Sequence, residues 1–111
     1  MHTVMWTFQV PAETTKADLR DTIEQTAGSY LNIPGLIRKY YGIAADGRTL
    51  CGIYLWHTRA QAEAFYTPEW VALVTKRWGA PPIRAEWETP MVVESEAAHL
   101  VPAASFSRAA E

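Results

Sequence analysis

The sequence predicts an α+β domain of the ferredoxin-like, split β-α-β-β-α-β type with an antiparallel sheet. Alternating apolar residues mark strands over residues 3–10 and 83–89, and two further strands, residues 36–44 and 48–57, flank an Asp-Gly turn. Helical periodicity fills the two intervals between these strands. We expect a single domain over residues 1–95, since a chain of 111 residues is about one domain long.

The first strand is apolar on both of its faces. One face carries Val4, Trp6, Phe8 and Val10, and the other carries Met5. Apolar residues on both faces predict that both sides of the sheet are covered. Helices cover only one side in this arrangement, so a second copy of the chain is the simplest cover for the other side. We therefore expect a homodimer.

Capping residues predict the three helices. The first helix spans residues 16–31 and follows a Thr-x-x-Asp capping box, and a second box at residues 58–61 starts a short helix. The third helix begins at Thr67-Pro68, where Thr is the N-cap and Pro takes the first helical position, and it ends at Gly79.

The Asp46-Gly47 dipeptide predicts a two-residue hairpin, because a type I′ turn needs positive φ at both central positions. This turn sets the register of the two strands and places Trp56 opposite Ile37, Tyr54 opposite Lys39, and Gly52 opposite Tyr41. Strand alternation puts His57 on the opposite face from Trp56.

The end of the chain is less regular. Residues 83–89 alternate as a half-exposed strand, and Pro90 bends or ends it before a short apolar extension. Residues 96–111 are rich in Ala and Ser and have no clear period. We expect this segment to be a C-terminal tail that is either disordered or packed on the partner subunit.

Composition excludes several classes of function. The net charge is -2 and no Lys/Arg cluster is present, which argues against nucleic acid as a partner. The chain has no apolar run of ~18 residues, so we expect no membrane span. The N-terminus lacks the pattern of a signal peptide, and a lone thiol at Cys51 suits a reducing compartment, so we expect a cytoplasmic protein.

The chain carries no standard catalytic or metal-binding signature such as a Walker loop, GxGxxG, HExxH or GxSxG. The three histidines His2, His57 and His99 are too scattered for a metal motif, and Cys51 has no ligand partner at useful spacing, so no metal site is expected. Glu86 and Glu88 share a strand face and are expected to be solvated.

An aromatic constellation remains as the candidate site. Tyr41, Tyr54 and Trp56 share one predicted sheet face, and the facing helical surface is supplied by Phe65, Trp70, Val74 and Trp78. A cleft lined by aromatic rings with a few polar tips suits a flat hydrophobic ligand. The alternative is that these rings only pack against one another in the core.

The stretch IPGLIRKYYG…DG…GIYLWHTRAQAEAFYTPEW resembles the antibiotic-biosynthesis-type monooxygenases and their YdhR-like relatives. The resemblance covers residues 3 to 95 and rests on the Pro-Gly-Leu before the second strand, the hairpin, and the strand-ending Trp followed by a helix cap. It implies the dimeric α+β barrel, a homodimer whose sheets face each other. The activity follows less directly, because unlike functions share this fold.

The anthrone oxygenases of polyketide biosynthesis, one branch of the family, carry an Asn-x-x-x-Trp strand motif. They use no metal or flavin, and the substrate passes an electron from its own carbanion to O₂. The resemblance places their Trp at Trp56 and their Asn at Gly52, which has no side chain. The heme-degrading branch has a His in its second helical region. None lies between Pro68 and Gly79, so heme degradation is not expected.

We therefore expect a cofactor-independent monooxygenase that acts on a small aromatic, quinol- or polyketide-type substrate with O₂. The expected catalytic residues are Trp56 and His57. His57 is either a general base near neutral pH or an exposed or interface residue at the strand-helix junction. The expected substrate-binding residues are Trp6, Lys39, Tyr41, Tyr54, Phe65 and Trp78. The alternatives are a cofactor-free polyketide cyclase or isomerase and a non-catalytic binding or assembly module.

Overall fold

The computed structural model describes residues 1–96 and 99–102 of the chain. In order, the elements are β1 (His2–Gln9), α1 (Lys16–Ala27), η1 (Gly28–Tyr30), β2 (Leu36–Ile43), β3 (Thr49–Trp56), α2 (Arg59–Phe65), α3 (Pro68–Trp78), β4 (Ile83–Glu88), β5 (Met91–Glu94) and β6 (His99–Pro102). Up to β4 this is the predicted β-α-β-β-α-β order, with the second helix divided into α2 and α3.

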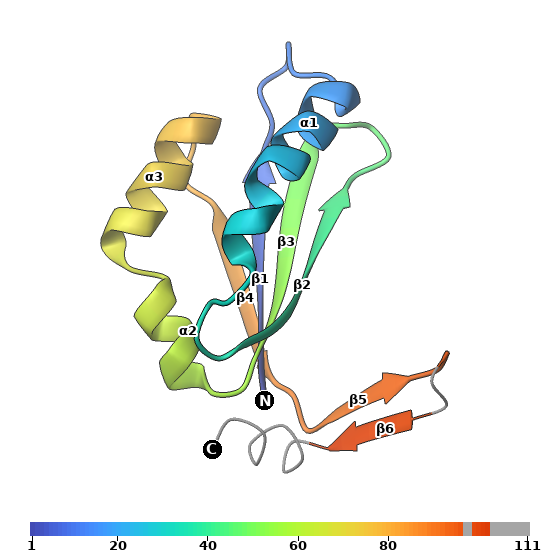
Figure 1. The fold of residues 1–111 in the computed structure, drawn as a ribbon. Coiled ribbons are helices and arrows are strands. Elements are labelled where there is room, and N and C mark those ends of the chain that lie inside the picture. Colours follow the sequence, from blue (N-terminus) through green and yellow to red (C-terminus); the bar gives the residue numbers. More distant parts are fainter. Residues whose placement is uncertain (97–98, 103–111) are drawn as a thin grey trace.

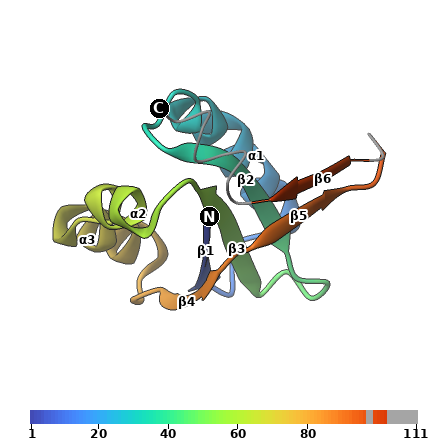
Figure 2. The same cartoon turned by 90° about the horizontal axis from the view of Figure 1, so that it is seen from below.

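The main sheet has four strands in the order β2-β3-β1-β4, and each neighbouring pair is antiparallel. Figures 1 and 2 show the helices on one side of this sheet. Buried Val4, Trp6 and Phe8 of β1 join Leu19 of α1 and Val74 of α3 in a single hydrophobic core. The ferredoxin-like α+β fold is therefore confirmed, with its core between the sheet and the helices.

The helix boundaries follow the predicted caps. The Thr15 hydroxyl accepts a hydrogen bond from the Asp18 backbone nitrogen at 3.1 Å, and the Asp18 carboxylate accepts one from the Thr15 backbone nitrogen at 2.9 Å. This capping box starts α1 as predicted. The helix ends earlier than predicted, at Ala27, and a single turn of 3-10 helix carries the chain on to Tyr30.

The start and the end of α3 also lie where the caps predict. The Thr67 hydroxyl accepts a hydrogen bond from the Trp70 backbone nitrogen at 3.1 Å, and Pro68 opens the helix. Gly79 ends it in the left-handed conformation with φ of 81°.

The hairpin between β2 and β3 has the predicted register but a different turn. Positive φ is confined to Gly47, at 71°, so the turn is not type I′. The Gly47 backbone nitrogen donates to the Ala44 carbonyl at 2.9 Å, and the Ala44 nitrogen donates to the Thr49 carbonyl. A four-residue connection thus gives the pairing expected from a two-residue loop, and Lys39 lies opposite Tyr54 and Tyr41 opposite Gly52.

The predicted pairing of Trp56 with Ile37 is wrong. A β-bulge between Leu36 and Arg38 removes Ile37 from the ladder, and Trp56 pairs with Leu36 instead. A bulge adds one residue to one strand and shifts the register beyond it by one. The residues on the turn side of the bulge keep the predicted register.

The face of the sheet away from the helices carries an apolar row. Tyr40 pairs with Ile53, Ile53 with Met5, and Met5 with Ala85, so the row crosses all four strands. At one edge of the same face Trp87 is 52% exposed. None of the helices that the structure describes covers this face, and we call it the open face.

One face of β4 carries charged side chains and the other carries apolar ones. Arg84 lies opposite Trp6 and Glu86 opposite Val4, so both point to the helix side of the sheet. Arg84 forms an ion pair with Glu63 of α2, and its Nε lies 2.9 Å from Glu86 Oε2. These ion pairs keep the charged face of β4 beside α2 and leave its apolar face exposed.

The β5–β6 hairpin projects from the end of β4, away from α2 and α3 (Figure 1). Arg38 of β2 forms an ion pair with Glu94 of β5 and ties the hairpin to the sheet. β6 lies inside the tail predicted over residues 96–111, to which the sequence assigned no element. The rest of that tail, residues 97–98 and 103–111, lies outside the described residues.

Candidate functional site

A cavity of about 40 Å³ lies between the helix face of the sheet and helices α1 and α3. Its apolar walls include six aromatic side chains, from Phe8, Tyr30, Tyr41, Tyr54, Trp70 and Trp78. Lys39, Thr22, Thr26 and Arg77 supply polar groups. The cavity holds about one or two water molecules, so a fused-ring ligand requires the side chains at its mouth to move.

The sheet sets the floor of this cavity. Lys39 and Tyr41 alternate along β2 and lie opposite Tyr54 and Gly52 of β3. Because side chains two residues apart share a strand face, these side chains all point toward the helices. The bulge at Ile37 lies outside this stretch, so it leaves the floor in register.

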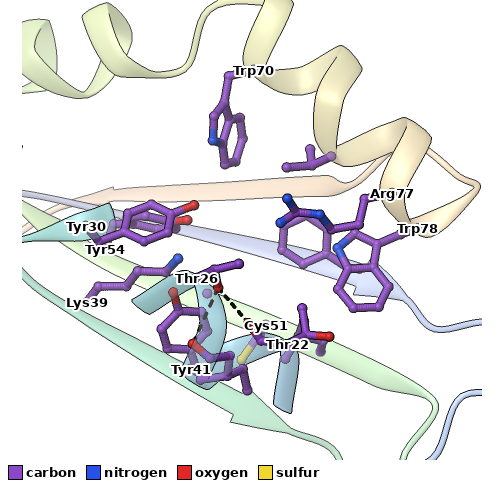
Figure 3. Close-up of a pocket in the computed structure, with 15 residues that line it drawn as sticks. Thr22, Thr26, Tyr30, Lys39, Tyr41, Cys51, Tyr54, Trp70, Arg77 and Trp78 are labelled. Carbon is purple, nitrogen blue, oxygen red and sulfur yellow. Dashed lines mark hydrogen bonds between the residues drawn. The ribbon is translucent and has the colours of Figure 1, made fainter. Parts of the chain in front are cut away.

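Lys39 is the central polar group of the cavity. Its Nζ lies 3.3 Å from the Tyr30 ring centroid, 4.0 Å from that of Tyr41 and 4.5 Å from that of Tyr54. Figure 3 shows the amine pointing into the space between these rings, with Arg77 and Trp78 of α3 across from it. Burial lowers the pKa of Lys39 to about 7, and the positive charge of Arg77 acts in the same direction.

The absence of a side chain at Gly52 leaves space for the Lys39 side chain. A Cβ at this position would lie 3.4 Å from Lys39 Cε and 3.1 Å from Tyr54 Cε1. Gly52 is buried, and the stem of Lys39 passes over it. The resemblance predicts a polar group at this position of β3, and here the amine from the neighbouring strand lies beside it.

The tyrosines of the floor are held as neutral phenols. Burial raises the pKa of Tyr54 well above its usual range, and it raises the pKa of Tyr41 as well. A neutral phenol can donate a hydrogen bond to an anion in the cavity. These hydroxyls therefore suit the stabilisation of an oxyanion.

The two helices form the walls and the mouth. Trp70, Val74 and Arg77 recur at four- and three-residue spacing along α3 and so line one face of the helix. On α1, the Thr26 hydroxyl donates a hydrogen bond to the Thr22 carbonyl at 3.0 Å, so its hydrogen is already used by the helix backbone. Arg77 is exposed and lies at the mouth.

Trp56 lies behind the floor and does not line the cavity. It is fully buried, stacks on Tyr54 with ring centroids 6.2 Å apart, and donates its Nε1 proton to the Tyr66 hydroxyl at 3.1 Å. Trp6 and Phe65 belong to the same aromatic cluster and are likewise absent from the cavity lining. The structure thus brings Lys39, Tyr41, Tyr54 and Trp78 together and keeps the other predicted binding residues behind them.

His57 lies apart from the cavity. It lines a shallow depression with His2, Arg59, Glu86 and Trp87 at the start of β1. The His2 ring nitrogen Nε2 lies 2.9 Å from Glu86 Oε1, and the Nε of Arg59 lies 3.7 Å from the same oxygen. A direct contact between His57 and a ligand in the aromatic cavity is not supported by this placement.

Sequence reasoning missed several lining residues, among them Arg77 and Tyr30, and this network of charges. Arg77 could have been found from the spacing of Trp70 and Val74 on the same helical face. Tyr30 lies in η1, where the predicted helical period no longer applies. The arrangement of Arg84 and Glu86 toward the helices depends on Glu63 of α2, which sequence alternation does not show.

No group of three or more His, Cys, Asp or Glu side chains within the described residues is placed to hold a metal ion. Across the same residues, none of the helices is long and apolar enough to cross a membrane.

No protein-family model and no curated protein sequence matches the chain. Solved structures do match. A Deinococcus radiodurans protein assigned to the antibiotic biosynthesis monooxygenases superimposes with a TM-score of 0.65 at 13% identity, over 85% of this chain and 97% of that one.

Two Streptomyces proteins give similar values. The monooxygenase ActVA-Orf6 of Streptomyces coelicolor, in complex with nanaomycin D, has a TM-score of 0.61 at 16% identity over 79% of this chain and 86% of its own. SnoaB, a cofactor-independent oxygenase from Streptomyces nogalater, has a TM-score of 0.60 at 16% identity, over 84% of this chain and 96% of its own. The chain therefore has the fold of the antibiotic biosynthesis monooxygenases, as the resemblance predicts.

Proposed function

We propose that this protein is a cofactor-independent monooxygenase that oxidises an aromatic, quinol- or polyketide-type substrate with O₂. The observation that carries the proposal is the cavity between sheet and helices, walled by aromatic rings around one buried amine. The fold, shared with SnoaB and ActVA-Orf6, supports the same kind of chemistry. A non-catalytic module needs no such cavity.

The reaction begins with the loss of a proton from the substrate. An anthrone that loses its acidic C–H proton becomes a delocalised carbanion, which transfers an electron to O₂. The resulting radicals combine in a hydroperoxide, and loss of water leaves a quinone. One anthrone and one O₂ thus give one anthraquinone and one water, and no further oxidant is needed.

The residues of the cavity suit this sequence of steps. Aromatic walls keep water from the carbanion. The neutral hydroxyls of Tyr41 and Tyr54 can donate hydrogen bonds to the enolate oxygen. The small volume requires Arg77 and Trp78 to open when substrate enters, because they lie at the α3 wall.

Oxygen uptake with anthrone tests the proposal. Chelator-treated protein should consume O₂ in proportion to anthrone and form anthraquinone, identified by mass spectrometry. The cyclase alternative gives a different product from a linear polyketide, since cyclisation loses water and gains no oxygen. Protein that binds anthrone or quinol without consuming O₂ contradicts the oxygenase proposal.

We propose also that the protein is a homodimer joined through the open face. The row from Tyr40 to Ala85 crosses the sheet, and Ile83, 64% exposed, lies on the same face. A monomer seldom exposes an apolar patch of this extent. A second copy with the same face gives a self-complementary contact.

The mass in solution tests the dimer. Light scattering coupled to size exclusion should give twice the chain mass of 12.5 kDa at micromolar concentration. Trp87→Glu on the open face should produce monomers with an unchanged circular dichroism spectrum. Leu73→Glu is the matched control, because Leu73 is similarly exposed but lies on α3. A monomeric wild type contradicts the proposal.

A further inference from the structure

We propose that Lys39 is the base that takes the proton from the substrate. This inference rests on the proposed function for its class of substrate, a phenol or anthrone with an acidic proton. It assigns the first step of the reaction to one atom, Lys39 Nζ, rather than to His57.

The position of the amine supports this role. Nζ lies within 4.5 Å of the ring centroids of Tyr30, Tyr41 and Tyr54 and lines the cavity. Among the described residues, Lys39 makes no ion pair and no hydrogen bond to another side chain. Its lone pair is therefore available to a ligand that enters the cavity.

The charges around Lys39 favour the neutral amine. The ionisable groups that face the cavity are the hydroxyls of Tyr30, Tyr41 and Tyr54 and the Arg77 guanidinium, whereas the strand register puts the Cys51 thiol on the open face beside Gly42. No carboxylate from the described residues lines it, so no negative partner holds the proton on Lys39. With its pKa lowered to about 7, about half of the molecules carry a neutral amine at neutral pH.

The same surroundings accept the charge once the proton has moved. Three aromatic faces within cation-π distance stabilise the ammonium that forms. The ammonium then lies beside the substrate anion and stabilises it as an ion pair. The rings thus favour the product of the proton transfer, while burial keeps the amine neutral before substrate binds.

The proton balance closes within one turnover. Nζ takes the proton and the electron pair stays on the substrate, which reduces O₂ as described above. The protonated Lys39 returns this proton to the outer oxygen of the peroxide, which gives the hydroperoxide. The neutral amine then takes the remaining proton from the same carbon, the C–H electron pair forms the new carbonyl, and the O–O bond breaks. The departing hydroxide receives that second proton from Lys39 and leaves as water. The amine is neutral again for the next substrate.

Binding of para-nitrophenol tests the proton transfer without any oxidation. At neutral pH, where part of the Lys39 amines are neutral, a larger fraction of para-nitrophenol should absorb as the phenolate when bound to the wild type than in free solution, because Lys39 takes the proton and the ammonium pairs with the phenolate. Lys39→Met should bind it as the neutral phenol. Lys76→Met, on the exposed end of α3, is the matched control and should behave as the wild type.

The pH profile with anthrone separates a base from a fixed positive charge. The wild-type kcat/KM should rise as pH passes through about 7, where Lys39 loses its proton. Lys39→Arg keeps the charge but cannot release its proton in this range. Its rise should move to the higher pH at which the substrate itself ionises.

The outcomes divide between the two proposals. Equal ionisation of para-nitrophenol by the wild type and Lys39→Met, or no binding by either, overturns Lys39 as the base. This role is also overturned if kcat/KM of Lys39→Arg rises at the same pH as that of the wild type. Ionisation that depends on Lys39 without oxygen uptake from anthrone supports the base and overturns the oxygenase.

Discussion

Lys39 Nζ lies 3.3 Å from the centre of the Tyr30 ring, and a Cβ on Gly52 would lie 3.4 Å from Lys39 Cε. An amine that enters from β2 thus occupies the space beside a glycine of β3. Tyr30 covers it from η1. Residues from β2, β3 and η1 together hold the central polar group of the cavity.

The stability of the fold should depend on the protonation of Lys39. Its pKa is about 7 in the folded protein, against 10.5 when exposed to water. Between these values the unfolded chain holds a proton that the folded chain lacks, so the free energy of unfolding should rise with pH from about 7 upward. Below pH 7 both states hold the proton, and this contribution should be constant.

Lys39→Met isolates this effect. We expect the variant to gain about 1–2 kcal/mol at acidic pH, after allowance for solvent screening, and to lose this gain as pH rises. Urea denaturation at several pH values measures it, with Lys76→Met as control. Parallel curves for the wild type and Lys39→Met would contradict the buried amine.

Gly52→Ala should disturb the site more than the fold. Its Cβ would lie 3.1 Å from Tyr54 Cε1 and 3.4 Å from Lys39 Cε, so both must give way. We expect about 1 kcal/mol of destabilisation and a loss of Lys39-dependent phenol ionisation. Gly42→Ala is the control, since its Cβ would meet Cys51 Sγ at 2.7 Å rather than Lys39. Phenol ionisation that survives in Gly52→Ala would argue against the close contact.

Trp56→Phe should act mainly on stability. The change removes the Trp56 donor to the Tyr66 hydroxyl and leaves a void in a fully buried position. We expect a loss of about 2 kcal/mol, measured by urea denaturation. Trp78→Phe, which alters the cavity wall, should instead raise KM for anthrone with a smaller change in stability. A raised KM in Trp56→Phe, with stability lost mainly in Trp78→Phe, would place Trp56 in the site, as the family resemblance predicts.

Substitution by alanine should destabilise the protein at Gly79 and stabilise it at Gly28, two glycines near helix ends. Gly79 has φ of 81°, which costs a residue with a Cβ about 1 kcal/mol. Gly28 has φ of -60°, and no atom lies within 4 Å of the place an alanine methyl would take, so Gly28→Ala should stabilise by about 0.5 kcal/mol. Thermal denaturation of both variants measures the difference, and equal shifts would contradict the assigned helix ends.

The sequence predicts the order of elements because caps and alternation are local signals. The register of Lys39 with Tyr54 is predicted correctly although the turn type is wrong, since the two connections bring the same residues into pairing. The bulge at Ile37 is not predicted because nothing in the strand marks it. The face of β4 depends on a partner, Glu63, that only the fold brings near Arg84.

The candidate site is predicted in part for the same reason. Strand alternation places Lys39, Tyr41 and Tyr54 on one face, and the structure brings them together. It also places Trp56 on that face, but alternation does not distinguish a residue that lines a cavity from one buried behind it. Tyr30 comes from outside the periodic helix, and so the ring nearest to Lys39 is not predicted.

Incubation of the protein with anthrone under isotopically labelled O₂ tests both the oxygenase reaction and the role of Lys39 in it. We expect wild-type protein to form anthraquinone with one labelled oxygen at the new carbonyl, and Lys39→Met to form it far more slowly. Anthraquinone without the label, or equal rates for the two proteins, would contradict this expectation.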